Sequence, residues 1–298
     1  MKKILAFLLV TILATVAGCS MFGPQENGEI ELTDDFGRTS TLEGPAESII
    51  SLVPATTEIL FALGVGELII GATEYCNYPE EALDIPRMGA FDQPNIELIV
   101  SLEPDLVLAA SLHKETVEAL EELGIAVLAL DPHSFEEVYS NIETLATAVG
   151  REQAGQALID DMQSRLEQVT EALSGLSEEE KPLVYYEVWY PDPMTVGGGT
   201  FIDRIINLAG GRNLAGDLSG YPIISEELLI DSSPDVILHG HFDADSSVFG
   251  QRPGWEDISA VTMERVYFVD QDIVNRPGPR MVEAVELMAK LFHPELFD

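Results

Sequence analysis

The sequence predicts an α/β protein with two lobes, each built on a mostly parallel sheet, joined by one long rigid helix. Short apolar segments alternate with helical patterns in both halves of the 298-residue chain. An uninterrupted amphipathic segment lies between these halves, and one motif occurs once in each half. Strands that alternate with helices are typical of parallel sheets, so we expect one such sheet in each lobe.

The central segment, residues 151–173, predicts the long helix. Its apolar residues recur at steps of three and four, which places them on one face: Ala154, Leu158, Met162, Leu166, Val169 and Leu173. At about 1.5 Å per residue the helix would span roughly 35 Å, whereas a typical helix has only about 11–12 residues. We interpret it as a rigid bridge over residues 151–175. The alternative is an ordinary long surface helix.

The elements on either side follow from apolar periodicity and from turn residues. The first lobe, residues 48–150, is expected to contain strands at 48–53, 68–72, 106–110 and 126–130, and helices at 54–63, 95–102, 114–123 and 135–149. The second lobe, residues 176–298, is expected to contain strands at 183–188, 236–238 and 266–269, and helices at 200–209, 226–230 and 281–292.

The N-terminus has the pattern of a lipoprotein signal peptide, predicted over residues 1–19. Two lysines precede an apolar run at 4–16, which is too short to span a membrane. The run ends in Val16-Ala17-Gly18-Cys19, so we expect the Cys19 thiol to carry the lipid. A polar tether and a hairpin around residues 34–37 complete the segment 20–47. No disulfide is expected, because Cys76 is the only other cysteine.

The motif that occurs in both halves begins at Glu97 and again at Glu227. Each glutamate is followed at the same distance by a Pro-Asp pair and an apolar strand, at Pro104-Asp105 and Pro234-Asp235. The two glutamates are therefore expected to lie in equivalent places on two lobes of similar build. The alternative is that helix, Pro-Asp turn and strand form a common connection with no such meaning.

The charge is strongly acidic, with 52 Asp plus Glu against 15 Lys plus Arg and a net charge of −37. Such a surface repels nucleic acid and anionic lipid headgroups. A basic partner or adaptation to high salt could account for it, and the scattered positions of the acids favour the second.

No pattern of enzyme chemistry is present in the sequence. The glycines from Gly64 to Gly71 precede a strand rather than a helix, which is the wrong order for a phosphate-binding loop. No serine lies in a nucleophile elbow. Five histidines (His113, His133, His239, His241 and His293) show no zinc-ligand spacing. The sequence therefore predicts neither an enzyme nor a metal site.

Aromatic residues instead collect in loops that follow predicted strands, where α/β lobes place ligands. They are Tyr75, Tyr78, Phe91, Trp189, Tyr190, Tyr221, Phe242 and Trp255. Aromatic planes around a cleft suit a large flat ligand. The alternative is that half of them pack beneath the loops.

Together, the lipoprotein signal, the segment 51–64, Tyr75-Cys-Asn-Tyr-Pro79 and the Glu97 motif resemble the substrate-binding proteins of ABC importers for vitamin B12 and iron complexes. The Tyr-x-x-Tyr-Pro sequence is most similar to the cobalamin-binding branch. The resemblance, which runs from about residue 48 to the C-terminus, implies two α/β lobes joined by one rigid helix. It also implies that one glutamate per lobe, at Glu97 and Glu227, docks onto arginines of the membrane permease.

The same resemblance implies the ligand contacts. Tyr75 and a C-terminal loop match residues that contact the corrin ligand in that branch, and Phe91 and Tyr221 fall where the branch often has Trp. The loop comprises Asp272, Ile273, Val274, Asn275 and Arg276. Ile273 stands where an aromatic residue can occur, and with Phe91 and Tyr221 it leaves the choice of ligand open.

We therefore expect a monomeric, lipid-anchored binding protein on the extracytoplasmic side of the membrane. It would have no cofactor and would not bind nucleic acid. It would capture cobalamin or a related corrinoid between its lobes and deliver it to an ABC permease with its ATPase subunits. The first alternative is an iron-siderophore or haem binder on the same fold. The second is a secreted lipoprotein enzyme.

Overall fold

The computed structural model describes residues 28–240 and 245–297, and the predicted signal peptide lies outside them. The first sheet has the order β4 (Ile69–Ala72), β3 (Ile49–Ser51), β5 (Leu106–Ala109), β6 (Val127–Ala129), and all its strands are parallel. Its helices are α1 (Pro54–Ala62), α2 (Ile96–Ser101), α3 (Lys114–Glu122) and α4 (Phe135–Ala148). The predicted hairpin, β1 (Ile30–Thr33) and β2 (Thr39–Leu42), precedes this sheet.

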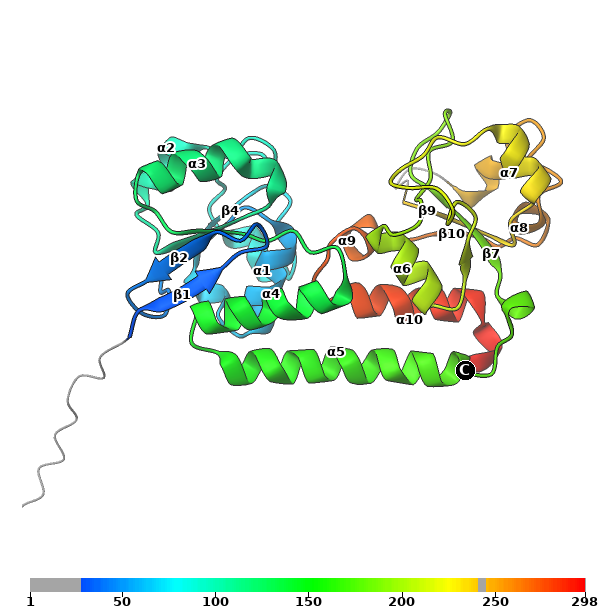
Figure 1. Ribbon diagram of the computed structural model, residues 1–298. Coiled ribbons are helices and arrows are strands. Elements are labelled where there is room, and N and C mark those ends of the chain that lie inside the picture. Colours follow the sequence, from blue (N-terminus) through cyan, green and yellow to red (C-terminus); the bar gives the residue numbers. More distant parts are fainter. Residues whose placement is uncertain (1–27, 241–244, 298) are drawn as a thin grey trace, which may run out of the picture.

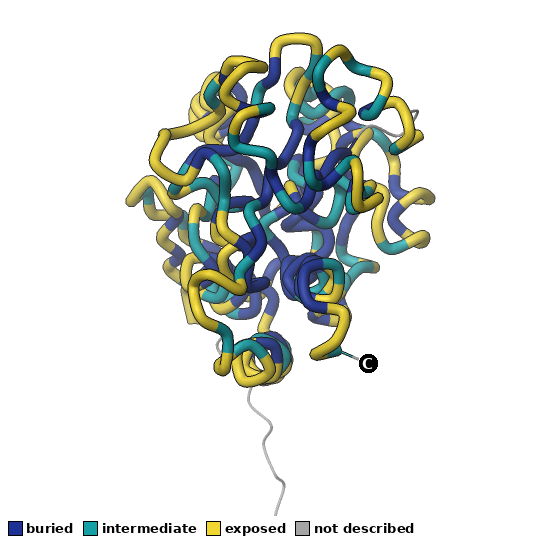
Figure 2. Tube along the Cα trace, turned by 90° about the vertical axis from the view of Figure 1, so that its right-hand side faces the viewer, coloured by how far each residue is buried: buried dark blue, intermediate teal, exposed yellow. Residues whose placement is uncertain are grey.

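The second sheet has the order β10 (Val266–Phe268), β9 (Val236–His239), β7 (Leu183–Glu187), β8 (Arg212–Asn213), and it too is parallel. Its helices are α6 (Phe201–Leu208), α7 (Glu226–Ser232), α8 (Ser259–Thr262), α9 (Gln271–Val274) and α10 (Met281–Phe292). The α/β class with two parallel sheets is therefore confirmed. In Figure 2, the buried part of the chain runs through the interior and the exposed part forms the periphery.

Short elements account for most of the differences from the predicted elements. The sequence did not predict β8, α8 and α9, because two to four residues are too few to show a period. Short 3-10 helices, also not predicted, occupy connections at Gly66–Leu68, Glu80–Asp84, Ser111–His113, Glu178–Glu180 and Ser246–Gln251, and one more, Pro294–Leu296, follows α10.

The long central helix is α5 (Glu152–Leu173), which starts one residue after the predicted position. It runs beside both sheet units and packs against α4 of the first and α10 of the second (Figure 1). Gly155 allows a close approach to α4, because a Cβ there would come within 2.6 Å of the Ala146 Cβ. Further along, Arg165 donates two hydrogen bonds to Glu286 of α10, at 2.9 and 2.7 Å. One helix therefore holds a helix of each unit.

The two copies of the repeated motif have the same local structure. Asn95 caps α2 by accepting a hydrogen bond from the Leu98 N–H, and Ser225 caps α7 by accepting one from the Leu228 N–H. The acids of the two Pro-Asp pairs also match. Asp105 accepts a bond from the Ser48 N–H, just before β3 begins, and Asp235 accepts one from the Leu183 N–H, where β7 begins.

The left-handed residue that ends each helix matches as well, with φ of 47° at Glu103 and 43° at Ser233. The resemblance between the halves therefore extends from sequence to backbone. Consequently, Glu97 and Glu227 occupy the same position, the second residue of a capped helix, and both are exposed.

A helix held along both units should limit hinge bending, as should the buried ion pairs between the units described below. We expect X-ray scattering curves of the ligand-free and ligand-bound protein to be nearly superimposable, since rigid contacts must break before a hinge can close. A clear fall in the radius of gyration when ligand is added would contradict this expectation.

Candidate ligand-binding site

A cavity of about 310 Å³ lies at the carboxyl ends of all four strands of the first sheet. Its walls include Val53–Thr56 after β3, Tyr75 after β4, Ala110 and Leu112 after β5, and Leu130–Pro132 after β6. This edge is where open α/β sheets bind ligands. Residues from beyond β10 of the second sheet close the cavity: Asp272, Asn275, Arg276 and Pro277. A short segment of the second unit therefore completes a site at the carboxyl end of the first sheet.

Two aromatic side chains, Tyr75 and Phe91, form part of this wall. Their ring centroids lie 6.3 Å apart in an edge-to-face arrangement, and Tyr75 is 60% exposed. Phe91 also meets the ring of His113 edge-to-face at 5.4 Å. A rigid aromatic surface and a more exposed phenol therefore face the ligand space.

His113 is a buried structural residue that supports this wall. Its Nδ1 accepts a hydrogen bond from the Ala110 N–H at 3.0 Å, and its Nε2 therefore donates to the Phe91 carbonyl at 2.6 Å. Burial lowers the pKa of the imidazole, which favours the neutral ring. With both nitrogens engaged, His113 holds the backbone of Phe91.

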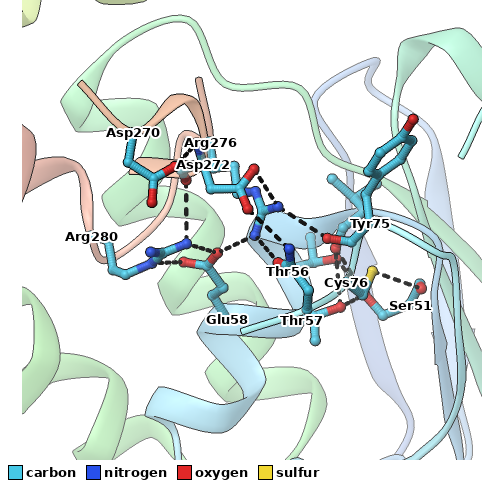
Figure 3. A network of polar contacts seen from close by, with 12 residues as sticks. Ser51, Thr56, Thr57, Glu58, Tyr75, Cys76, Asp270, Asp272, Arg276 and Arg280 are labelled. Atoms are coloured by element: carbon cyan, nitrogen blue, oxygen red, sulfur yellow. Dashed lines mark hydrogen bonds and ion pairs between the residues drawn. The ribbon is translucent and has the colours of Figure 1, made fainter. Parts of the chain in front are cut away.

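Beneath the cavity, a cluster of buried ions joins the two units (Figure 3). Glu58 rises from α1 and is only 4% exposed. Its carboxylate accepts two hydrogen bonds from Arg280, at 2.8 and 2.6 Å, and one from Arg276 at 3.0 Å. Both arginines are also buried, at 9% and 8% exposed. One carboxylate of the first unit therefore binds two guanidinium groups of the second.

Arg276 is engaged by three further groups. Its terminal nitrogens donate to Asn77 Oδ1 at 2.8 Å and to the Tyr75 carbonyl at 3.1 Å, and they pair with Asp272 Oδ1 at 2.7 Å. Only its Nε–H has no acceptor among the described residues. Most donors of this guanidinium therefore bind the protein itself, and because Arg276 still lines the cavity, its contact with the ligand stays a prediction.

The remaining predicted ligand contacts divide into two groups. Tyr75, Phe91, Asp272 and Asn275 line the cavity together with Arg276. Ile273, Val274 and Tyr221 do not. The sequence predicted a loop here, but residues 271–274 form α9, which turns the 1% exposed Val274 into the core and packs Ile273 against it. These two side chains therefore face the core rather than the cavity in this structure, and their ligand contacts stay predictions.

Tyr221 lies elsewhere, on the loop before α7, and is 56% exposed. Trp189, just after β7, and Ile223 are exposed to a similar degree. Met194 bridges to both of them, so the three segments lie together. They form an apolar surface near the carboxyl end of the second sheet.

Sequence reasoning missed Glu58 and Arg280, which form the centre of the ion cluster. A signal was present, because Glu58 stands in the apolar segment Pro54-Ala-Thr-Thr-Glu-Ile-Leu-Phe-Ala62. A carboxylate buried in such a segment needs a cation. Nothing local indicates which of the fifteen basic residues supplies it.

Two other candidates from the sequence, Trp255 and Cys76, carry no ligand chemistry. Trp255 is fully buried and packs edge-to-face on Tyr185 and Tyr190. Cys76 is a buried free thiol. Cys19, His241 and Phe242 lie outside the described residues. Within those residues, no three His, Cys, Asp or Glu side chains gather as metal ligands, and no helix is long and apolar enough to cross a membrane.

Comparison with known proteins gives consistent matches. Residues 49–273 match the family model of the periplasmic binding proteins. The "uncharacterized ABC transporter substrate-binding lipoprotein YvrC" of Bacillus subtilis is 33% identical, over 100% of this chain and 99% of its own length. The structure of the vitamin B12-binding protein BtuF of Vibrio cholerae superposes with a TM-score of 0.72 at 28% identity, covering 85% and 99% of the two chains. The structure of the haem-binding protein RhuT of a Roseiflexus species superposes with a TM-score of 0.75 at 26% sequence identity. The match covers 84% of this chain and 99% of that one.

Proposed function

The chain belongs to the periplasmic binding protein family, and we propose that it captures cobalamin or a related corrinoid and delivers it to an ABC permease. The coarser assignment, a substrate-binding protein of an ABC transporter, follows from the family. Such proteins work with permease and ATPase components. The relatives are binding proteins, which agrees with the lack of enzyme patterns in the sequence.

The observation that carries the proposal is the chemistry of the cavity wall. It combines apolar and aromatic surface with carboxylate and amide side chains, namely Asp131, Asp272, Asn141 and Asn275. Carboxylates accept hydrogen bonds, and side-chain amides both donate and accept them. The peripheral amides of a corrinoid offer both kinds of partner around a flat apolar ring.

A corrinoid is larger than the cavity and would extend toward the second unit. Asp272 and residues 275–277, which follow β10 at the carboxyl edge of the second sheet, already line the cavity. Near that edge, Trp189, Tyr221 and Ile223 are each more than half exposed. These side chains offer an apolar second wall, which supports the proposed contact of Tyr221 with the ligand.

Haem is the second candidate, and one observation favours it. Haem iron takes an axial ligand such as His, Cys, Met or Tyr. Among the described residues, Tyr75 is the only one of these types in the cavity wall, and both nitrogens of the adjacent His113 are engaged. The similarity to a haem-binding protein points the same way. An anionic ferric siderophore fits less well, because Arg276, the one cation that the described residues place in the wall, is paired with acids. The same pairing counts against the two propionates of haem.

We further propose that the protein is anchored on the extracytoplasmic side through a lipid on Cys19. The lipoprotein signal in the sequence and the name of the Bacillus relative support this localisation.

Replacing Tyr75 with Ala tests the site. We expect cyanocobalamin binding to weaken by roughly 1–3 kcal/mol in isothermal titration calorimetry, the scale of burying one large side chain, here against the ligand. The matched control is Phe36→Ala, because Phe36 is similarly exposed, at 52%, but does not line this cavity. Equal dissociation constants for wild type and Tyr75→Ala would remove Tyr75 from the site.

A further inference from the structure

The charges around the cavity are arranged unusually for a site with an arginine in its wall. Among the described residues, the wall contains one cation, Arg276, and two carboxylates, Asp131 and Asp272. The cation is the most buried of the three. A ligand in the cavity therefore meets more carboxylate than guanidinium.

The guanidinium of Arg276 is also neutralised twice. Glu58 approaches it from beneath at 3.0 Å, and Asp272 from the cavity side at 2.7 Å. Arg280 shares Glu58, so two arginines and two acids form a cluster with no net charge. Asp131 then leaves the wall negative, and in a partly enclosed site that charge is felt more strongly than in water.

Asp272 is not needed to satisfy the hydrogen-bond donors of Arg276, because other acceptors already surround the guanidinium. Without it, Arg276 would still have Glu58, the Asn77 amide oxygen and the Tyr75 carbonyl as acceptors. Asp272 stands at the rim with a side chain that is 37% exposed, and its second oxygen accepts a hydrogen bond from Asn77 at 3.0 Å. It occupies the direction from which a ligand carboxylate would reach Arg276.

We propose that Asp272 and Glu58 determine the charge specificity of the site. By occupying the guanidinium of Arg276, they exclude anionic ligands and select a ligand whose polar groups are neutral amides. Asp272 acts at the cavity rim, and Glu58 acts through Arg276 as a positioning residue. The inference rests on the proposed function, because it takes a corrinoid with neutral amides as the ligand.

The test compares ligands of equal shape and different charge. Cyanocobalamin and its separated monocarboxylates, in which one propionamide is replaced by a propionate, are titrated calorimetrically into wild-type protein and into Asp272→Asn. We expect the wild type to prefer the amide. For at least one monocarboxylate, Asp272→Asn should reduce that preference about fivefold, the upper scale of an exposed charge pair. Asp161→Asn is the control, because it removes an equally negative charge that is 65% exposed on α5.

Glu58→Gln provides a second test, provided that circular dichroism shows it folded, and it should reduce the preference in the same direction. Unchanged preferences in Asp272→Asn, or a wild type that binds a monocarboxylate more tightly than the amide, would overturn the inference while leaving corrinoid binding intact. If the wild type bound no corrinoid, the proposed function would fail. Haemin and its uncharged dimethyl ester would then replace cyanocobalamin and its monocarboxylates in the same titrations. Tighter binding of haemin than of the ester would overturn the charge inference as well.

Discussion

Glu58→Ala is expected to lower the free energy of unfolding by about 3–5 kcal/mol, the usual cost of removing one partner from a buried ion pair. The change leaves Arg276 and Arg280 buried with no carboxylate beneath them. Asp272 pairs with only one of them through its side chain. Because Glu58 belongs to the first unit and the arginines to the second, the loss should also loosen the contact between the units.

Urea unfolding followed by circular dichroism measures this loss. Glu58→Gln has nearly the same shape, so it should reproduce most of the effect if charge rather than packing is the cause. Glu143→Ala, an exposed glutamate on α4, should change stability by no more than about 0.5 kcal/mol. Similar midpoints for Glu58→Ala and Glu143→Ala would show that the ion cluster does not hold the units together.

The double change Glu97→Ala with Glu227→Ala is expected to reduce transport sharply while leaving ligand affinity unchanged. The two glutamates occupy the same position in two equivalent capped helices, so they present two separated negative points. One exposed ion pair contributes only about 0–1 kcal/mol. Two pairs formed together on one partner gain from effective concentration, so each single change should be milder.

Uptake of ligand into vesicles that contain the reconstituted permease and ATPase measures this effect. Glu143→Ala with Glu256→Ala is the matched control, because it removes one exposed acid from each unit outside the repeated motif. Full uptake by the Glu97 and Glu227 double variant would mean that these acids only favour the positive ends of their helices.

Much of the fold could be predicted from the sequence because its determinants are local. The apolar positions of α5 repeat along the chain, although the two positions that lie deepest near its start, Gly155 and Ile159, were not among them. The Pro-Asp motif predicted equivalent structure because it repeats at the same spacing, although each aspartate binds backbone that lies 57 or 52 positions away in the sequence. Elements of two to four residues, such as β8 and α9, contain too few positions for any period to appear.

The candidate site was less accessible because it depends on contacts between distant segments. The resemblance indicated Tyr75 and residues 272–276, and the structure brings most of them together. It could not show that Arg276 binds Glu58 across 218 positions, or that Arg280 joins them across 222. The sequence also could not show that Val274 is buried, because its orientation toward the core depends on the single helical turn of α9.

The most direct test of the central claim is a binding panel with purified protein. Cyanocobalamin, haemin and a ferric siderophore are offered separately and in competition, and bound ligand is quantified by absorbance after desalting and by calorimetry. We predict that cyanocobalamin is retained at one molecule per chain and that neither iron ligand displaces it at equal concentration. Retention of haemin or the siderophore, with no cyanocobalamin bound, would contradict the proposal.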